Sequence, residues 1–237
     1  MRRNGRTAHK LRKLAWRFRQ PDWADNHGVM LPVKHALVSP GIAREIYLGD
    51  YEAKEIEIIS KRLATDDVVF EVGAGLGFLS AYCAKRTGAE RVFAYEANPE
   101  LIPLIRETHA RNSVAPTLIN ALLAKGDGER EFHLEDDFWA SSAHRSGGRS
   151  ITVKQMDLNT ELARVKPSFL IVDIEGGEAE FFAGADLSSV RKLCVETHPD
   201  VLGDQVLSEM FAGLVAKGLV LDFSLIRKNV FFFHRPA

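Results

Sequence analysis

Three glycines directly after a short apolar run constrain the fold of this chain more than any other feature. Residues 68–77 read V-V-F-E-V-G-A-G-L-G, and a helix-like segment, residues 78–86, follows at once. This order predicts a buried strand, a tight glycine turn and a helix N-terminus, where a small molecule can approach bare backbone. A chain that contains such a unit is expected to be an α/β protein.

The spacing of the glycines indicates which small molecule binds. A dinucleotide-binding turn reads G-x-G-x-x-G and would place its third small residue at position 78. Position 78 is Phe, and the third glycine, Gly77, comes one residue early. The carboxylate of Glu71 at the strand end suits hydroxyl and ammonium groups and disfavours a pyrophosphate. The turn therefore favours a positively charged nucleoside such as S-adenosylmethionine, and an NAD-dependent reductase is a distant alternative.

The composition is that of a globular protein in a reducing compartment. The 237 residues, 46% of them hydrophobic, allow one large α/β core. Cys83 and Cys194 lie in apolar segments and imply no disulfide framework. No run approaches the roughly 20 apolar residues of a membrane span, and no apolar core follows the basic N-terminus to make a secretory signal. We therefore expect a cytoplasmic protein.

Residues 1–20 form a basic arm that holds eight Lys and Arg and no acid, whereas the rest of the chain is acidic. Leu11, Leu14 and Phe18 recur at helical spacing. Residues 2–19 are a tether to an anionic membrane or an acidic glycan, or else a mobile leader or an arm that lies on the chain's own acidic body. We favour the leader or arm over the tether. No feature predicts a specific nucleic-acid partner, and the oligomeric state stays open.

The pattern after the arm predicts a helical or irregular cap over residues 21–66 and a main domain over 67–237. In the cap, residues 21–40 are rich in turn residues, and 41–63 read as helical with a break at Gly49-Asp50. Asp50 is expected to cap a helix that starts near position 51.

Strands and helices alternate in the main domain. Asn98-Pro99 predicts the start of a helix over 100–111, and the last two strands form a closing hairpin. The alternation predicts a mostly parallel sheet with both faces covered. The expected strands are 68–72, 91–96, 117–121, 130–134, 151–155, 169–173, 192–196, 219–223 and 229–233.

Acids recur where these strands end, and ligands of parallel sheets gather at that edge. Glu96 ends the second expected strand, where a carboxylate can accept both ribose hydroxyls of a nucleoside. The alternative is a solvated Glu favoured by the dipole of the next helix. Ala97 follows Glu96, and Asn120 and Ala121 end the third strand, near the expected adenine.

A second acidic cluster, V-D-I-E-G-G-E over residues 172–178, follows another apolar run. Capping of the next helix would explain one of its acids, but not Asp173, Glu175 and Glu178 together. The segment Glu196-Thr197-His198 ends the neighbouring strand. An unperturbed imidazole titrates near neutral pH, so His198 is the expected proton acceptor, although a lone His is more often structural.

The glycine turn, E-A-N-P over 96–99, the D-x-E-G-x-E segment and E-T-H over 196–198 together resemble the FkbM family of class I S-adenosylmethionine-dependent methyltransferases. The resemblance covers about residues 49–198. It implies a Rossmann-like, seven-stranded, mostly parallel sheet with an antiparallel last strand and helices on both faces. It also implies methyl transfer to a hydroxyl oxygen of a sugar, a glycan or a secondary metabolite.

Roles for individual residues follow from the resemblance. The acceptor hydroxyl is expected between Asp173, Glu175 and His198, beneath Trp139 and its loop. Glu71 stands where the family often has Asp, and this longer acid is expected to shift the cofactor's geometry while keeping it bound. The expected cofactor-binding residues are Tyr51, Glu52, Glu71, Gly73, Gly75, Gly77, Glu96, Ala97, Asn120, Ala121 and Asp173.

Two further alternatives stay open. A metal-assisted methyltransferase would use Asp173, Glu175 and Glu196 to hold Mg²⁺ and lower the pKa of the acceptor hydroxyl, although we do not expect a metal. A catalytically silent domain would bind a nucleoside and recruit a partner through its basic arm. The intact glycines and the strand-end acids favour an enzyme over this second alternative.

Overall fold

The computed structural model describes residues 12–16, 18, 20–134 and 149–236, which form two compact units. The first unit covers residues 1–53 and the second covers 54–237. The second unit therefore begins before residue 67, where the main domain is expected to begin.

The first unit contains a hairpin where the sequence predicts irregular structure. Strands β1 (Trp23–Asn26) and β2 (Val29–Pro32) pair antiparallel. The two residues between them, His27 and Gly28, have positive φ values of 52° and 87°, as a tight two-residue hairpin turn requires. Strands of four residues are too short to show a reliable alternating pattern, so the sequence does not reveal them.

The described part of the basic arm packs within the first unit. Residues 12–16 are helical. Arg12 Nη2 donates to the Asp25 carbonyl oxygen at 3.3 Å, and its guanidinium lies 5.5 Å from the ring centroid of Tyr47. The Trp16 ring lies 5.2 Å from the same ring. The rest of the expected tether falls outside the described residues, so its binding to a membrane or glycan stays a prediction.

The helical pattern over 41–63 forms two helices, with the break near the expected position. Helix α2 (Pro40–Leu48) ends at Gly49, which has a φ of 81°. Helix α3 (Ala53–Arg62) begins slightly later than expected, and Ala53 N donates to the Asp50 carbonyl oxygen at 3.3 Å.

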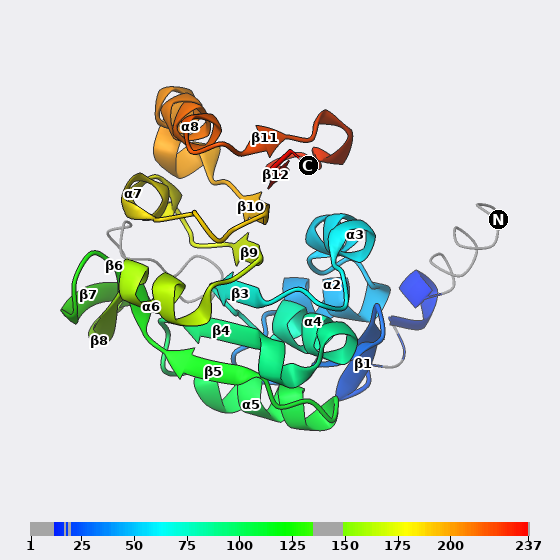
Figure 1. Ribbon diagram of the computed structural model, residues 1–237. Helices are drawn as coiled ribbons and strands as arrows, with labels where there is room; N and C mark the ends of the chain where they lie inside the picture. Colours follow the sequence, from blue (N-terminus) through cyan, green and yellow to red (C-terminus); the bar gives the residue numbers. More distant parts are fainter. Residues whose placement is uncertain (1–11, 17, 19, 135–148, 237) are drawn as a thin grey trace. The chain divides into compact units, whose positions relative to one another are not determined.

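A seven-stranded sheet forms the centre of the second unit (Figure 1), in the order β11-β12-β10-β9-β3-β4-β5. The pairs from β5 to β10 are parallel, whereas β12 is antiparallel to both of its neighbours. The fold class predicted from the sequence is therefore confirmed. The strands are β3 (Val69–Val72), β4 (Val92–Glu96), β5 (Thr117–Asn120), β9 (Phe169–Val172), β10 (Lys192–Glu196), β11 (Val220–Leu221) and β12 (Val230–His234).

Helices cover both faces of this sheet (Figure 1), with α3, α4 and α5 on one face and α6, α7 and α8 on the other. Every residue of β3 and β9 is buried, as expected for central parallel strands. The helices of the second unit after α3 are α4 (Phe78–Thr87), α5 (Ile102–Arg111), α6 (Leu158–Val165), α7 (Glu178–Gly184) and α8 (Pro199–Ala216).

Two local details differ from the sequence prediction. Helix α5 begins at Ile102 rather than at Glu100, because Asn98 Oδ1 accepts from Glu100 N at 2.9 Å and caps a turn that precedes the helix. The expected strands 130–134 and 151–155 are β7 (Gly128–Leu134) and β8 (Arg149–Asp157), which pair antiparallel in a separate sheet of order β6-β8-β7. The third strand of that sheet, β6 (Leu122–Ala124), follows β5 directly and is not among the expected strands.

The turns after β3 and β9 touch through their backbones where the strand order reverses. Val72 pairs with Tyr95 of β4 on one side and with Val172 of β9 on the other. A Cβ atom on Gly73 would lie 1.8 Å from the carbonyl oxygen of Asp173, and Gly73 has a φ of 86°. Only glycine fits there. This switch point is where open α/β sheets form their ligand crevice.

The contact at Gly73 predicts a large difference between two glycine substitutions. Gly73→Ala and Gly126→Ala both force a side chain into positive φ, at a cost of about 1–2 kcal/mol. Gly126 has a φ of 80° and nothing within 4 Å of its Cβ position, so it is the matched control. We expect Gly73→Ala to cost a further ~1–3 kcal/mol or more, because the β9 turn must move. Equal free energies of unfolding in urea for the two variants would contradict the backbone contact.

Candidate functional site

The backbone N–H groups of the glycine turn after β3 donate hydrogen bonds to other groups of the protein. Gly73 N and Ala74 N both donate to the Tyr95 carbonyl oxygen, at 3.0 and 3.1 Å. Gly75 N donates to Glu96 Oε2 at 2.9 Å. A turn that binds pyrophosphate points free N–H groups at its ligand. This turn instead presents a carboxylate, which supports a nucleoside ligand that lacks a pyrophosphate.

Glu96 lies at the end of β4 with both carboxylate oxygens held. Oε2 accepts from Gly75 N, and Oε1 accepts from Asn98 N at 2.8 Å. The residue is only 7% exposed. Burial raises the pKa of Glu96, while the N–H groups of Asn98 and Gly75 act against that shift. A carboxylate oxygen can accept two hydrogen bonds, so this fixed group retains acceptor capacity for ribose hydroxyls.

Asn120, Ala97 and Ala121 lie beside Glu96. Asn120 Nδ2 donates to the carbonyl oxygens of Glu96 and Ala97, at 2.7 and 3.2 Å. Ala121 N donates to the same Glu96 carbonyl at 3.0 Å. These bonds tie the ends of β4 and β5 together at the edge of the crevice. Their contact with an adenine ring stays a prediction.

Glu71 is buried beneath the turn. It is 1% exposed, and its Oε2 has no hydrogen-bond partner among the described residues. Burial raises the pKa of Glu71 to about 8, and repulsion by Glu96 also raises it, whereas the hydrogen bonds with Ser80 lower it. The carboxyl group is therefore largely protonated at neutral pH. Its expected contact with the amino-acid end of the cofactor stays a prediction.

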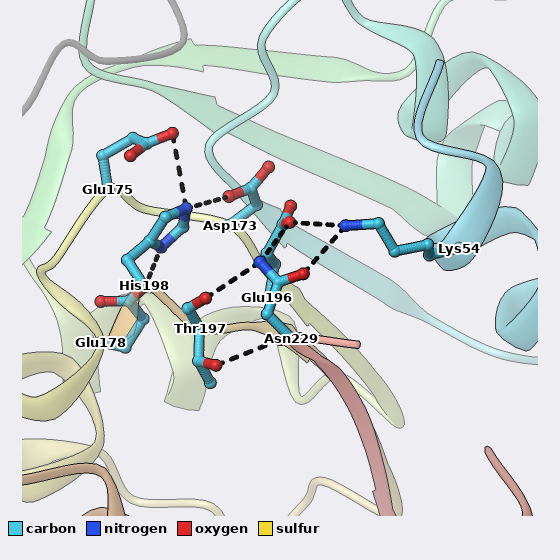
Figure 2. A network of polar contacts seen from close by, with 8 residues as sticks. All are labelled: Lys54, Asp173, Glu175, Glu178, Glu196, Thr197, His198 and Asn229. Atoms are coloured by element: carbon cyan, nitrogen blue, oxygen red, sulfur yellow. Dashed lines mark hydrogen bonds and ion pairs between the residues drawn. The ribbon is translucent and has the colours of Figure 1, made fainter. Parts of the chain in front are cut away.

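A polar network centred on His198 joins the ends of β9 and β10 (Figure 2). His198 Nδ1 is hydrogen-bonded to Glu178 Oε1, and Glu178 is fully buried. His198 Nε2 lies 3.4 Å from Glu175 Oε1 and 3.8 Å from Asp173 Oδ1. The structure thus brings together the three expected catalytic residues, Asp173, Glu175 and His198.

The surrounding carboxylates change the protonation of His198. Burial by itself lowers the pKa of His198, but the hydrogen bonds with Glu175 and Glu178 and the charge of Asp173 outweigh burial and raise the pKa to about 11. His198 is therefore an imidazolium at neutral pH in this arrangement. An imidazolium donates a proton and cannot accept one. His198 is therefore not available as the base in this arrangement, and the carboxylates that it contacts, Asp173 and Glu175, are the remaining candidates for that role.

A second group of contacts surrounds Glu196 on the far side of Asp173 (Figure 2). Lys54 Nζ donates to Glu196 Oε1 at 3.2 Å and to Asn229 Oδ1 at 2.9 Å, and Asn229 Nδ2 donates to Glu196 Oε1 at 2.7 Å. Glu55, beside Lys54 in α3, is 3% exposed. Burial, together with repulsion by Glu196, raises the pKa of Glu55 to about 7. One ammonium group thus offsets part of a concentrated negative charge.

Among the described residues, one set of side chains has the geometry of a metal site. Ligand atoms of Asp173, Glu196 and His198 all lie within 4.8 Å of one another. The metal site expected from the sequence consists of Asp173, Glu175 and Glu196, so the structure has His198 where Glu175 was expected. This set is a poor match for Mg²⁺, because Mg²⁺ prefers oxygen ligands to the imidazole nitrogen of His198. In addition, the ammonium group of Lys54 already contacts Glu196.

Three expected site residues lie outside the described part of the second unit. Tyr51 and Glu52 belong to the first unit, where Asn26 Nδ2 donates to the Tyr51 carbonyl oxygen at 3.0 Å. Trp139 and its loop fall outside the described residues. Their closure over the cofactor and acceptor therefore stays a prediction.

Sequence reasoning missed the structural roles of Lys54 and Asn229. Lys54 follows the expected cofactor-binding residues Tyr51 and Glu52 closely, and Asn229 lies in the turn before β12, but both are far in the chain from their partner Glu196. The sequence names Glu178 as part of the D-x-E-G-x-E segment but does not predict its contact with His198. Its position at the start of α7 turns it toward His198 at the start of α8.

Across the part of the chain that the structure describes, each helix is too short or too polar to cross a bilayer.

Comparison with known proteins assigns these motifs to a family. The model of the methyltransferase FkbM domain matches residues 71–214. Over 156 residues the chain is 29% identical to the hexuronic acid methyltransferase AglP of Haloferax volcanii, covering 63% of this chain and 64% of AglP. The chain therefore spans less than two thirds of that relative.

Solved structures show the same fold at low sequence identity. A methyltransferase from Pyrococcus furiosus is 12% identical, with a TM-score of 0.51 and 98% of each chain covered. Trm1 from Pyrococcus horikoshii, in complex with S-adenosyl-L-methionine, is 15% identical, with a TM-score of 0.50, 90% of this chain and 60% of Trm1 covered.

The buried carboxyl group of Glu71 predicts a pH dependence of stability. Burial raises its pKa from 4.5 to about 8 in the folded state. The protonated carboxyl group contributes fully to stability at pH values below the pKa of Glu71 in the unfolded chain, 4.5. As the pH rises from there toward the folded pKa of about 8, this contribution declines by ~1.4 kcal/mol per pH unit. Glu71→Gln has no such titration. We therefore expect the free energy of unfolding of the wild type, measured in urea, to fall relative to that of Glu71→Gln as the pH rises.

The exposed residue Glu107 of α5 supplies the control, because Glu107→Gln should leave the wild-type pH dependence unchanged. Parallel pH profiles for the wild type and Glu71→Gln would show that the carboxyl group is not held neutral.

Proposed function

Because this chain belongs to the FkbM family of class I S-adenosylmethionine-dependent methyltransferases, we propose that it methylates a hydroxyl oxygen of a sugar, a glycan or a secondary metabolite. The observation that carries the proposal is the backbone contact between Gly73 and Asp173, which brings the cofactor turn and the acidic cluster to one crevice. AglP, whose name describes a methyltransferase of a sugar acid, supports a sugar acceptor.

The residues at the ends of β3 and β4 fit S-adenosylmethionine. Gly75 brings no side chain to the turn, and Glu96 retains acceptor capacity for the ribose. S-adenosylmethionine, when bound, supplies an electrophilic methyl group on a positively charged sulfonium. The acidic groups at the strand ends favour such a cation, and Asp173 would flank the methionine end.

The acceptor hydroxyl is proposed to lie between Asp173, Glu175 and His198. Positioning of this hydroxyl can supply about 7–11 kcal/mol of the barrier reduction. A carboxylate of the pair Asp173–Glu175 would accept the hydroxyl proton, while the His198 imidazolium, fixed by Glu178, orients both carboxylates. A positioned base typically adds about 10²–10⁴-fold.

A metal-assisted reaction is the second candidate, and it is supported by the spacing of Asp173, Glu196 and His198. In this version a divalent cation would lower the pKa of the acceptor hydroxyl. Turnover that falls in EDTA and recovers with added Mg²⁺ would support it, and unchanged turnover would contradict it.

Glu96→Ala is expected to weaken cofactor binding. The substitution removes the acceptor of the ribose hydroxyls and also the acceptor of Gly75 N and Asn98 N. Hydrogen bonds to a charged group contribute about 1.5–3 kcal/mol, so the dissociation constant of S-adenosylhomocysteine, measured by calorimetry, should rise roughly 10–100-fold. Glu107→Ala, an exposed change on α5, is the control. An unchanged affinity in Glu96→Ala would refute ribose binding by this residue.

His198→Ala is expected to slow methyl transfer while leaving it measurable. Loss of the group that orients Asp173 and Glu175 should lower kcat by up to about 10²–10⁴-fold, with S-adenosylhomocysteine affinity little changed. The assay is transfer of a radiolabelled methyl group to an acceptor first identified in cell extracts. His133→Ala in β7, which is not one of the network residues, controls for a general effect of losing an imidazole. Undiminished turnover in His198→Ala would exclude the proposed role.

A further inference from the structure

A cavity of about 400 Å³ lies between the start of α8 and the loop before β12. Its volume falls in the range of small-molecule pockets, which is roughly 300–1,000 Å³. All of its lining residues belong to the second unit, and none of them is among the residues expected to bind the cofactor. The cavity therefore has room for a molecule that the site described above does not account for.

The cavity adjoins the polar network through shared residues (Figure 2). Thr197 and Asn229 line the cavity, and Asn229 also donates to Glu196 at 2.7 Å. Thr197 N donates to the Asn229 carbonyl oxygen at 2.8 Å. His198 lies between two lining residues in the chain, Thr197 and Pro199. The cavity and the network thus share Thr197 and Asn229, and His198 follows Thr197 directly in the chain.

The walls combine apolar and hydrogen-bonding groups. Leu207, Phe211 and Phe231 provide the apolar wall, and the two phenyl rings meet edge to face with centroids 4.8 Å apart. Asp204 and Ser208 of α8 line the same cavity and are exposed. A pyranose ring matches this pattern, because it has an apolar C–H face and hydroxyl groups that both donate and accept hydrogen bonds.

A glycine kink shapes the wall that α8 contributes. Gly203, between the lining residues Pro199 and Asp204, has a φ of 77° and a ψ of 160°, a conformation that is essentially restricted to glycine. Nothing lies within 4 Å of its Cβ position, so backbone conformation rather than space requires glycine here. The kink separates the first turn of α8 from its body, and both parts line the cavity.

We propose that this cavity binds the sugar ring of the methyl acceptor, with its C–H face on Phe211 and Phe231 and its hydroxyls at Asp204, Ser208 and Asn229. The inference rests on the proposed function and narrows its substrate class to a sugar. A fatty acyl chain would use the apolar wall but would form no hydrogen bonds with Asp204 or Ser208, so the two ligand chemistries predict different binding.

The test uses the full chain and saturation-transfer NMR with methyl β-glucoside, methyl β-glucuronide and octanoate as probes. We expect signals from the ring C–H protons of at least one glycoside. Ser208→Trp places an indole in the cavity from an exposed helix position and should abolish those signals. Glu209→Trp, at the next exposed position of the same helix and outside the lining, should leave them unchanged.

Binding of octanoate alone, no glycoside signal, or a signal that survives Ser208→Trp would each overturn the assignment. Calorimetry with S-adenosylhomocysteine on the same wild-type and variant samples separates this inference from the proposed function. Binding of S-adenosylhomocysteine without glycoside binding rejects only the sugar cavity. Absence of S-adenosylhomocysteine binding in the wild type rejects the proposed function itself.

Discussion

The contact between the Gly73 backbone and the Asp173 carbonyl is the constraint on which the rest of the site depends. It exists because β3 and β9 are parallel neighbours whose last residues, Val72 and Val172, pair with each other. The turns that follow the two strands are therefore in direct contact. A side chain at position 73 would separate the turns. With glycine there, the residues that follow each strand, Gly75 on one side and Glu175 on the other, open onto one crevice.

Carboxyl groups outnumber the cations that contact them in this crevice, which makes the crevice acidic. The turn satisfies its own N–H groups through Tyr95 and Glu96, so it offers an anion little. Asp173 and Glu196 stand near each other, and burial together with the charge of Glu196 raises the pKa of Asp173. Within the described residues, Lys54 and the His198 imidazolium are the cations that directly contact this group. A sulfonium cofactor would add positive charge where the protein concentrates negative charge.

The sequence predicted those parts of the site that follow directly from strand ends. Glycine spacing and a carboxylate after an apolar run are local patterns, so Gly73, Glu96 and Asp173 could be placed before the structure was known. The protonation of His198 could not, because it depends on Glu178 and Glu175, whose approach is set by the packing of α7 and α8. Lys54 and Asn229 were missed for the same reason: their partner, Glu196, is distant in the chain and is reached only through the sheet.

We propose that this crevice holds an adenosyl sulfonium compound, with its ribose on Glu96. Calorimetric titration of the purified wild-type chain with S-adenosylhomocysteine and, separately, with NADH tests this proposal. We expect binding of S-adenosylhomocysteine and no detectable binding of NADH. Binding of NADH without binding of S-adenosylhomocysteine would contradict it.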